Sequence, residues 1–282
     1  MRIHEALAQA HAAGVERLDA QRLLHHLLQR GRAWLLAHDD EALPPAHAAA
    51  WAALLARRVA GEPLAYLTGE REFHGLPLRV SPAVLVPRPD TETLVDWALE
   101  LLRGSLATVA RPQVADLGTG SGAIALAVKH GCPRAGLRAS DASTEALAVA
   151  RSNGLVLGLD ITWLQGSWWQ AFGAPAPGMG LNLALSNPPY IEAGDPHLAA
   201  LHHEPLSALV PPDGKGLSSL FAIIDGAGVF LAPGAWLLLE HGHDQADAVA
   251  ARMQAAGFEG VQHRHDLGGH RRCTGGRWPS AT

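Results

Sequence analysis

The fold is decided by the stretch Val114-Ala115-Asp116-Leu117-Gly118-Thr119-Gly120-Ser121-Gly122-Ala123. Val114–Leu117 is predicted to form a strand, and Ala123–His130 to form a helix directly after it. The glycines between them let the chain turn sharply and bring backbone N–H groups close to a ligand. Because the N-terminus of the following helix favours negative charge, this junction predicts a ligand site at the end of a strand.

Beyond this loop, predicted strands and helices alternate along the chain. The strands are expected at Leu137–Ser140, Ile161–Leu164, Leu181–Ser186 and Ala235–Glu240, with a closing pair at Val261–Asp266 and Arg272–Trp278. The later helices are expected at Glu145–Asn153, Ser218–Leu231 and Gln245–Ala256. This alternation predicts an α/β fold with a Rossmann-like, doubly wound parallel sheet and helices on both of its faces.

The chain of 282 residues is longer than a typical single domain, so we expect more than one. Residues 1–70 carry apolar side chains at helical spacing and predict a small all-helical domain. Residues 71–90, punctuated by Pro77 and Pro82, predict a β-hairpin or an extended linker. Residues 91–282 would then form the α/β domain.

Composition and charge narrow the class of protein. Hydrophobic residues make up 48% of the chain and the formal charge is −5, which disfavours a broad surface for nucleic acid because phosphate binding needs clustered Lys and Arg. Cys132 and Cys273 are expected to be reduced thiols, and the start of the chain lacks the hydrophobic core of a signal peptide. The apolar run around Val229–Leu239 falls short of the ~20 residues that a membrane span needs. We expect a soluble, cytoplasmic monomer without stable nucleic acid binding.

Two acidic residues near the glycine loop indicate the kind of ligand. Asp141 follows the next predicted strand, about 20 residues after the loop, where a carboxylate accepts hydrogen bonds from ribose hydroxyls. That position suits a nicotinamide cofactor and S-adenosylmethionine equally. Asp116, two residues before Gly118, favours the second, since it can hold a positively charged amino group or support the loop. A dehydrogenase usually keeps this position apolar, because the pyrophosphate nearby is an anion.

A second element follows the strand expected at Leu181–Ser186, where the chain continues Asn187-Pro188-Pro189-Tyr190. Ligands of open parallel sheets lie outside the carboxyl ends of the strands. The two prolines fix two φ angles and restrict the residue before them, so the segment is rigid. It displays two acceptors, the Asn187 side-chain oxygen and the Pro188 carbonyl, and Tyr190 adds an aromatic face for a planar group.

Paired acceptors of this kind solve a chemical problem. The nitrogen of an amide, or of the exocyclic amine of adenine, is a poor nucleophile because its lone pair is delocalised. Acceptors that bind both N–H protons aim the nitrogen at a sulfonium methyl and favour the positive charge that builds during transfer. We therefore predict a methyltransferase for a planar NH2 group, with Asn187, Pro188 and Tyr190 catalytic and Pro189 completing the substrate contacts.

With these elements the chain resembles the HemK/PrmC family, the protein-glutamine N5-methyltransferases of peptide chain release factors, over nearly its whole length. The resemblance rests on these motifs: Val86-Pro87-Arg88-Pro89-Asp90-Thr91-Glu92, Asp116–Gly122, Ser186–Tyr190, Glu204-Pro205 and Leu239-Glu240-His241-Gly242. The Asn-Pro-Pro-Tyr element alone is shared with adenine N6-methyltransferases. Its combination with the Pro-Arg-Pro-Asp-Thr-Glu segment and the helical N-terminal region is more specific.

The resemblance implies a seven-strand methyltransferase sheet, and a helical domain that helps to recognise the release factor. It implies that Gly118, Thr119, Gly120, Ser121 and Gly122 hold the methionine end of S-adenosylmethionine. It further implies that Asp141 holds the ribose, that Trp168 lies against the adenine ring, and that Asn187 faces both cofactor and substrate. The target would be the glutamine of the Gly-Gly-Gln tip of the release factor.

Two positions depart from common forms of the family. Asn182 stands where many relatives carry an acid. Ser167 stands where related methyltransferases often have an Asp for the adenine amine, which puts that contact in doubt.

Other readings stay open at this point. They are an adenine N6-methyltransferase, a glutamine methyltransferase of a ribosomal protein, and a nicotinamide oxidoreductase, although Asn187–Tyr190 has no role in hydride transfer. Glu240 either supports the pocket or is a plain strand-end acid. Arg88 and Glu92 either line the cofactor pocket or form a salt-bridged linker. No metal is expected, because the alternating histidines lack a carboxylate or cysteine cluster to complete a site.

Overall fold

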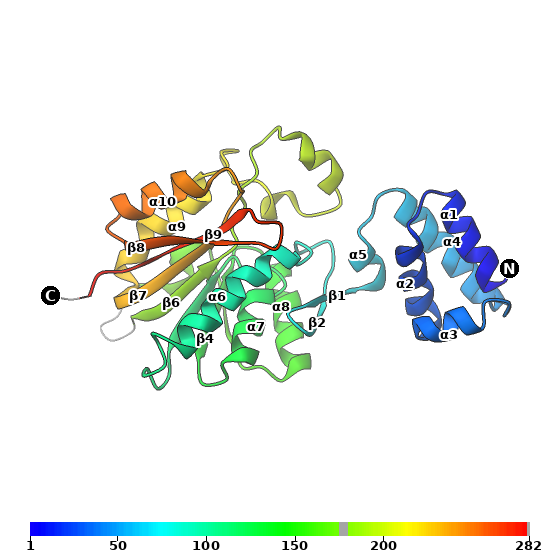
Figure 1. Cartoon of the computed structure of the whole chain (residues 1–282), viewed down its shortest axis with the longest axis horizontal. Coiled ribbons are helices and arrows are strands. Elements are labelled where there is room, and N and C mark those ends of the chain that lie inside the picture. The colour runs from blue at the N-terminus through cyan, green and yellow to red at the C-terminus, as the bar shows by residue number, and fades with distance from the viewer. Residues whose placement is uncertain (175–179, 281–282) are drawn as a thin grey trace. The chain divides into compact units, whose positions relative to one another are not determined.

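The computed structural model describes residues 1–174 and 180–280. The chain forms two compact units, Met1–Glu70 and a second unit that begins at Arg71 (Figure 1). Within the described residues, no helix has the length and apolar character of a membrane span.

The first unit is helical and consists of α1 (Ile3–Ala12), α2 (Arg17–Leu28), α3 (Arg32–Ala37), α4 (Pro45–Val59) and α5 (Leu64–Thr68). Leu23, Leu24 and Trp51 are completely buried in its core. The Trp51 indole N–H donates to Gln9 Oε1 at 3.1 Å, which ties α4 to α1. Sequence periodicity missed α3 and α5, because helices of 6 and 5 residues are too short to display an apolar stripe.

After α5 the chain forms a two-stranded hairpin, β1 (Glu70–Phe73) and β2 (Leu76–Arg79). Both turn residues have positive φ, 49° at His74 and 78° at Gly75, the combination that matches the twist of a tight hairpin. The buried Phe73 and Leu78 side chains join the core beside helix α6 (Glu92–Arg103). The Glu92 carboxylate accepts the His74 N–H at 3.1 Å, so the hairpin is attached to the start of this helix.

The second unit is built on a sheet that has seven strands within the described residues. They are β3 (Gln113–Leu117), β4 (Gly136–Asp141), β5 (Thr162–Gln165), β6 (Leu181–Ser186), β7 (Leu231–Glu240), β8 (Glu259–His265) and β9 (Arg271–Arg277). Their order is β5-β4-β3-β6-β7-β9-β8, with β9 antiparallel to both of its neighbours and the other pairs parallel. The predicted α/β fold with a largely parallel sheet is confirmed.

The order of the strands creates a switch point. From β3 the chain proceeds outward through β4 and β5, then returns to place β6 on the other side of β3. Leu117 at the end of β3 is paired with Ser186 at the end of β6, and the Ser186 hydroxyl donates to the Leu117 carbonyl at 2.6 Å. Residues that follow these two strands therefore leave the sheet side by side, and ligands of such sheets bind at this point.

Helices cover both faces of the sheet (Figure 1). One face carries α6, α7 (Ala123–Gly131) and α8 (Thr144–Leu157), and the other carries α9 (Ser218–Gly226) and α10 (Ala246–Ala255). Alternate residues of the strands divide between the two cores: Leu183 and Leu185 pack with α6 and α7, whereas Ala184 packs with α9 and α10. Burial on both faces explains why the strands appear in the sequence as nearly continuous apolar runs.

The helix predicted at Ser218–Leu231 was too long. Helix α9 ends at Gly226, a short 3-10 turn follows at Ala227–Val229, and β7 begins at Leu231 rather than at Ala235. Pro233 and Gly234 hid the start of this strand, since both residues disfavour regular strand structure. The strand accommodates them at an irregularity, where its register with β6 shifts between Leu181 and Leu183 and Gly234 has a φ of 80°.

Candidate active site

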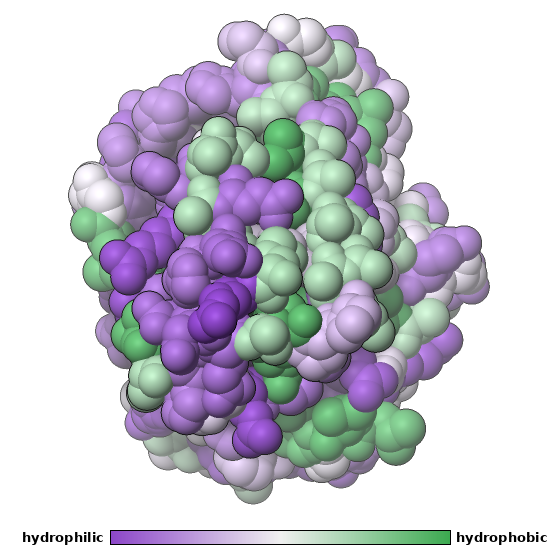
Figure 2. All heavy atoms as spheres, turned by 90° about the vertical axis from the view of Figure 1, so that its right-hand side faces the viewer, coloured by the Kyte–Doolittle hydropathy of each residue, from purple (hydrophilic) through white to green (hydrophobic). Residues whose placement is uncertain are grey.

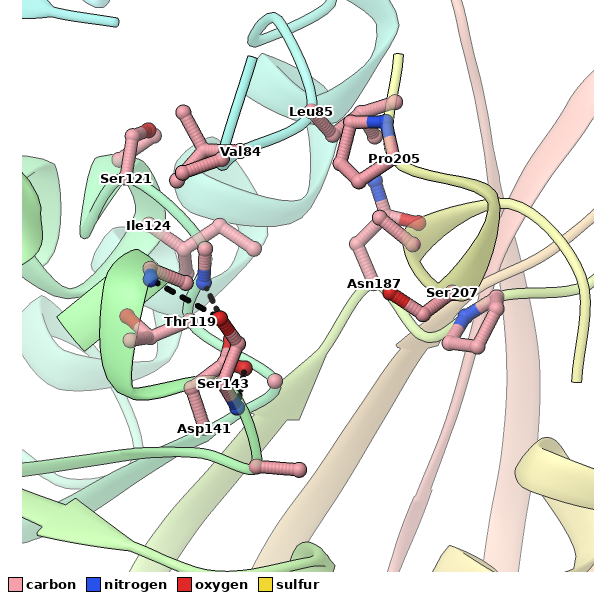
Figure 3. Close-up of a pocket in the computed structure, with 18 of the residues that line it drawn as sticks. Val84, Leu85, Thr119, Ser121, Ile124, Asp141, Ser143, Asn187, Pro205 and Ser207 are labelled. Carbon is pink, nitrogen blue, oxygen red and sulfur yellow. Dashed lines mark hydrogen bonds between the residues drawn. The ribbon is translucent and has the colours of Figure 1, made fainter. Parts of the chain in front are cut away.

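A cavity of about 260 Å³ lies at the carboxyl ends of β3, β4, β5 and β6 (Figure 3). One wall comes from the loops after these strands and includes Gly118, Thr119, Gly120, Ser121, Asp141, Ser143, Ser167, Trp168, Asn187 and Pro189. The opposite wall comes from two irregular segments, Ala83–Arg88 and Pro205–Pro212, through residues such as Val84, Leu85, Pro205 and Ser207. The switch point of the sheet thus carries a pocket with one polar and one largely apolar wall.

The glycine loop is shaped by its own backbone and by Trp168. Gly118 and Gly120 have φ values of 74° and 56°, which favour glycine. A Cβ atom on Gly118 would lie 2.9 Å from the Trp168 ring, so the indole packs directly on the loop. Trp168 itself has a φ of 44°, a conformation that costs a non-glycine residue about 1 kcal/mol or more. This strained position holds the ring at the pocket, where the family resemblance implies an adenine contact.

Asp141 organises the loop as well as lining the pocket. Its Oδ2 accepts the Gly120 N–H at 2.8 Å, and its Oδ1 accepts the Ser143 N–H at 2.9 Å (Figure 3). Burial raises the pKa of the Asp141 carboxyl, and the hydrogen bonds from these N–H groups oppose the rise. Each carboxylate oxygen keeps a second lone pair, so the side chain can still receive ribose hydroxyls.

Asp116 lies beneath the loop rather than on the pocket wall. Its Oδ2 accepts from the Thr119 hydroxyl at 2.6 Å and from the Ala125 N–H at 3.2 Å. The side chain is fully buried and its Oδ1 has no hydrogen-bond partner among the described residues. Burial raises the pKa of Asp116 to about 7. From the sequence, Asp116 is expected either to hold a positively charged amino group or to support the loop. Its contacts with Thr119 and Ala125 are those of a residue that supports the loop.

Asn187 enters the pocket from the end of β6 (Figure 3). Its side-chain Nδ2 donates to the Thr91 hydroxyl at 3.3 Å, so the amide nitrogen is engaged on the protein side and Oδ1 is the group left to accept from a ligand. The glycine loop and Asn187 are about seventy residues apart in the sequence, yet both line the same cavity.

The remaining predicted site residues lie around the cavity without lining it. Gly122 is the N-cap of α7, where a Cβ would lie 3.0 Å from Leu126 and 3.1 Å from Trp163, so close packing requires glycine there. Pro188 is absent from the pocket wall. Tyr190 is partly buried, and its hydroxyl lies 3.5 Å from Glu240 Oε1. Burial raises the pKa of this tyrosine well above its ordinary value.

Sequence reasoning did not assign a role to Glu204, which holds the opposite wall. Its side chain is 3% exposed; Oε2 accepts the Val86 N–H at 3.0 Å, and Oε1 pairs with the Arg88 guanidinium. These contacts of Glu204 join two irregular segments that are more than a hundred residues apart in the sequence. Arg88 also lines the pocket, whereas Glu92 does not and instead binds the hairpin.

Asn153, on α8, is a second positioning residue that the pattern did not reveal. Its Nδ2 donates to the Ser121 carbonyl at 2.9 Å and to the Arg79 carbonyl at 3.0 Å, so it connects the glycine loop to the end of the hairpin. Asn182, the departure noted in β6, accepts the Gln113 N–H at 2.8 Å at the start of β3, away from the cavity. Ser167, the other departure, lines the cavity.

Two of the alternating histidines contact the same threonine of the sheet: His263 lies in β8, and His241 directly follows β7. His241 Nε2 and His263 Nδ1 lie 2.6 Å and 2.9 Å from the Thr274 hydroxyl, which links β7, β8 and β9. Burial lowers the pKa of His241 to about 4, which favours its neutral form. Among the residues that the structure describes, no cluster of His, Cys, Asp and Glu is suited to a metal ion.

Comparison with known proteins agrees with this architecture. Residues 2–69 match the PrmC N-terminal domain, and residues 91–204 match the methyltransferase small domain. A release factor glutamine methyltransferase of Bordetella pertussis is 49% identical over 265 residues, covering 93% of this chain and 95% of that protein. Its counterpart in Burkholderia pseudomallei is 45% identical over 276 residues, covering 95% of this chain and 94% of that protein. The chain belongs to the release factor glutamine methyltransferase family.

The predicted resemblance to the HemK/PrmC family is thereby confirmed, as is S-adenosylmethionine as the cofactor. Among solved structures, a T. thermophilus 16S rRNA methyltransferase in complex with AdoMet and guanosine is 17% identical. It covers 74% of this chain and 49% of that one, with a TM-score of 0.54. This likeness concerns the fold alone, which is that of S-adenosylmethionine-dependent methyltransferases.

Proposed function

We propose that this enzyme transfers a methyl group from S-adenosylmethionine to the side-chain amide nitrogen, N5, of the glutamine in the Gly-Gly-Gln tip of peptide chain release factors. The curated relatives that support this are named release factor glutamine methyltransferases and match nearly full length. The observation that carries the proposal is the position of the Asn187 amide. This amide lines the pocket together with the glycine loop, and its nitrogen donates a hydrogen bond to Thr91.

The residues of the pocket fit the cofactor. S-adenosylmethionine supplies an electrophilic methyl group on a positively charged sulfur. In the proposed arrangement, Gly118–Ser121 hold its methionine end, because glycine at positive φ opens the backbone of the loop to a ligand. Asp141 would accept the ribose hydroxyls, and the Trp168 ring would lie against the adenine, since both residues line the cavity. The cavity of about 260 Å³ provides room beside these groups.

The acceptor amide is held by two oxygens in this proposal. Asn187 Oδ1 and the Pro188 carbonyl accept the two N–H protons of the glutamine and direct its nitrogen toward the methyl group. Their partial negative charge favours the positive charge that develops on nitrogen during transfer. The N-methyl amide formed in this step is initially cationic at nitrogen and acidic, so it loses its proton afterwards without a strong base poised beforehand.

The helical unit is proposed to recognise the rest of the release factor. It matches the PrmC N-terminal domain over residues 2–69 and leaves apolar side chains exposed, among them Leu18, Leu36 and Val59. Figure 2 shows hydrophobic groups among hydrophilic ones on the face that it presents. Such a surface supplies contact area that a tripeptide in the pocket lacks.

We also propose that the enzyme acts as a cytoplasmic monomer and does not bind nucleic acid stably. The formal charge of −5 argues against a broad phosphate-binding surface. Cys132 and Cys273 are both free and buried, as expected for an enzyme that acts in a reducing compartment on a component of translation.

The experiment that tests the proposal is the intact mass of a release factor after incubation with enzyme and S-adenosylmethionine. One added methyl group, mapped to the Gly-Gly-Gln glutamine by fragmentation, is the expected result. Asn187→Ala should lose the transfer, while Gln254→Ala, which removes an exposed side-chain amide on α10, should keep it. Methylation of double-stranded DNA without transfer to release factor would instead favour the adenine-modifying alternative.

A further inference from the structure

We propose that Glu204 is a positioning residue that joins two irregular segments and so fixes the width of the part of the cavity that takes the acceptor glutamine. The segments are Ala83–Arg88 and Pro205–Pro212, and residues of both line the cavity that Asn187 also lines. This inference rests on the proposed function. It adds to that function a residue that is not itself among those lining the cavity.

The first segment, Ala83–Arg88, lies outside the regular elements of the sheet. It runs between β2 and the 3-10 turn Pro89–Thr91. Pro82, Pro87 and Pro89 lack the N–H group that a β-ladder or a helix interior uses, so this stretch is poorly suited to regular backbone pairing. Its position therefore depends on contacts that individual residues make.

Glu204 makes two such contacts near the end of the segment. Its Oε2 accepts the Val86 N–H at 3.0 Å, and its Oε1 pairs with the Arg88 guanidinium. The Glu204 side chain is 3% exposed, and Val86 is buried as well. Without the carboxylate, a buried backbone N–H would lose its acceptor and a guanidinium its ion-pair partner. One side chain thus fixes the course of the backbone at Val86 and the direction of Arg88, which lines the cavity.

The segment that follows Glu204 is attached to the Asn-Pro-Pro-Tyr element. It turns back on itself, because the Ala208 N–H donates to the Pro205 carbonyl at 2.9 Å. The Leu209 carbonyl then accepts, also at 2.9 Å, the N–H of Ile191, the residue directly after that element. One hydrogen bond therefore joins the element to this segment, and Glu204, which directly precedes the segment, joins it to the first one.

Methyl transfer needs an acceptor nitrogen in the right place, and a displacement of about 1 Å can reduce the rate on the order of a hundredfold. The two segments and Asn187 line one cavity, so a shift of either segment changes the room in which a glutamine side chain lies against Asn187. Loss of the Glu204 contacts is therefore expected to disturb the acceptor.

The cofactor loop is held by other residues. The Gly120 N–H is bound by Asp141 at 2.8 Å, and the Ser121 carbonyl by Asn153 at 2.9 Å. These bonds do not pass through Glu204, so they remain when its carboxylate is replaced. A positioning role of Glu204 thus predicts a larger effect on transfer to the release factor than on the affinity for S-adenosylmethionine.

The first test is Glu204→Gln, which keeps the shape of the side chain but leaves one acceptor for two donors. We expect kcat/KM for the intact release factor to fall on the order of tenfold, the equivalent of one hydrogen bond to a charged group. The Kd for S-adenosylmethionine, measured by titration calorimetry, should rise less than about threefold. A Kd that rises in parallel with the loss of kcat/KM would overturn the inference.

Asp266, in the turn between β8 and β9, offers a matched control. Its side chain is 2% exposed, Oδ1 accepts the His270 N–H at 2.9 Å, and Oδ2 accepts from Arg272 at 3.1 Å. These are the same two kinds of contact that Glu204 makes, at a carboxylate that does not line the cavity. Asp266→Asn should lower the Tm about as much as Glu204→Gln and leave kcat/KM near that of wild type. A loss of transfer in both variants, or in neither, contradicts the assigned role.

A double-variant cycle tests whether Glu204 acts through its two partners. Arg88→Met removes the guanidinium, so the side chain introduced by Glu204→Gln has only the Val86 N–H to serve. Glu204→Gln should therefore reduce kcat/KM less in the Arg88→Met background than in wild type. Equal reductions in the two backgrounds would refute the coupling. Arg88→Lys, which keeps the charge but not the planar fork, should also impair the acceptor more than the cofactor, and replaces the first test if Glu204→Gln does not fold.

The failure of this inference differs from the failure of the proposed function. Wild-type enzyme that methylates the release factor, together with a Glu204→Gln variant of normal kcat/KM, refutes the positioning role alone. Wild-type enzyme that transfers nothing to the release factor refutes the proposed function, and the positioning role with it.

Discussion

Asp141 offers a perturbation whose size can be worked out from the structure. Replacing it by asparagine keeps the shape of the side chain but leaves one oxygen where there were two. The carboxylate now accepts from the Gly120 and Ser143 N–H groups at 2.8 and 2.9 Å. An asparagine can serve only one of them as acceptor, and its NH2 group then faces the other N–H.

Hydrogen bonds to a charged group contribute about 1.5–3 kcal/mol each. Gly120 belongs to the cofactor loop, so the loss of this bond disturbs the loop shape that the cofactor requires. This effect adds to the weaker contact with the ribose. We therefore expect Asp141→Asn to bind S-adenosylmethionine roughly 10- to 150-fold more weakly than wild type.

Titration calorimetry with S-adenosylmethionine, alongside thermal unfolding of the free protein, measures this effect. Asp160→Asn, which changes an exposed acid after α8, is the matched control and should bind normally. An unchanged Kd for a folded Asp141→Asn protein would show that the carboxylate neither shapes the loop for the cofactor nor receives its ribose. Asp141 would then be only the acid that precedes α8.

Three further predictions concern catalysis, substrate and stability. Asn187→Ala should lower kcat by about two orders of magnitude, or ~3 kcal/mol, with little change in cofactor affinity; steady-state and binding measurements together check this. Intact release factor should be methylated far more efficiently than a Gly-Gly-Gln peptide, and deletion of residues 1–70 should remove most of that difference in kcat/KM if the remaining protein stays folded. Burial raises the pKa of Asp116 to about 7, so the folded state keeps a proton that the unfolded chain releases near its ordinary pKa of about 3.9. The free energy of unfolding should accordingly contain a component that declines as the pH rises from about 4 to about 7, and Asp116→Asn should lack it in urea titrations.

The sequence by itself determined the regular part of the protein. Runs of apolar residues, separated by glycine or proline, predict strands and helices because burial on both faces of a parallel sheet requires them. The glycine loop and the Asn-Pro-Pro-Tyr element are local, rigid and placed at strand ends, so their position at the pocket follows from chain order alone. The main error was to predict the start of β7 at Ala235 rather than at Leu231. The error arose at Pro233 and Gly234, whose local conformational preference disfavours a strand although the sheet pairs this segment.

Only the tertiary structure decided how these elements are held. Glu204 contacts Val86 and Arg88 across up to 118 residues of the chain, and Asn187 contacts Thr91 across 96 residues. Asn153 likewise reaches from α8 to the glycine loop. These residues lie in irregular segments or occupy single buried positions, where no periodicity marks them. Their partners are set by which strand ends the sheet brings together, and hydrogen bonds across such distances in the chain leave no local pattern in the sequence.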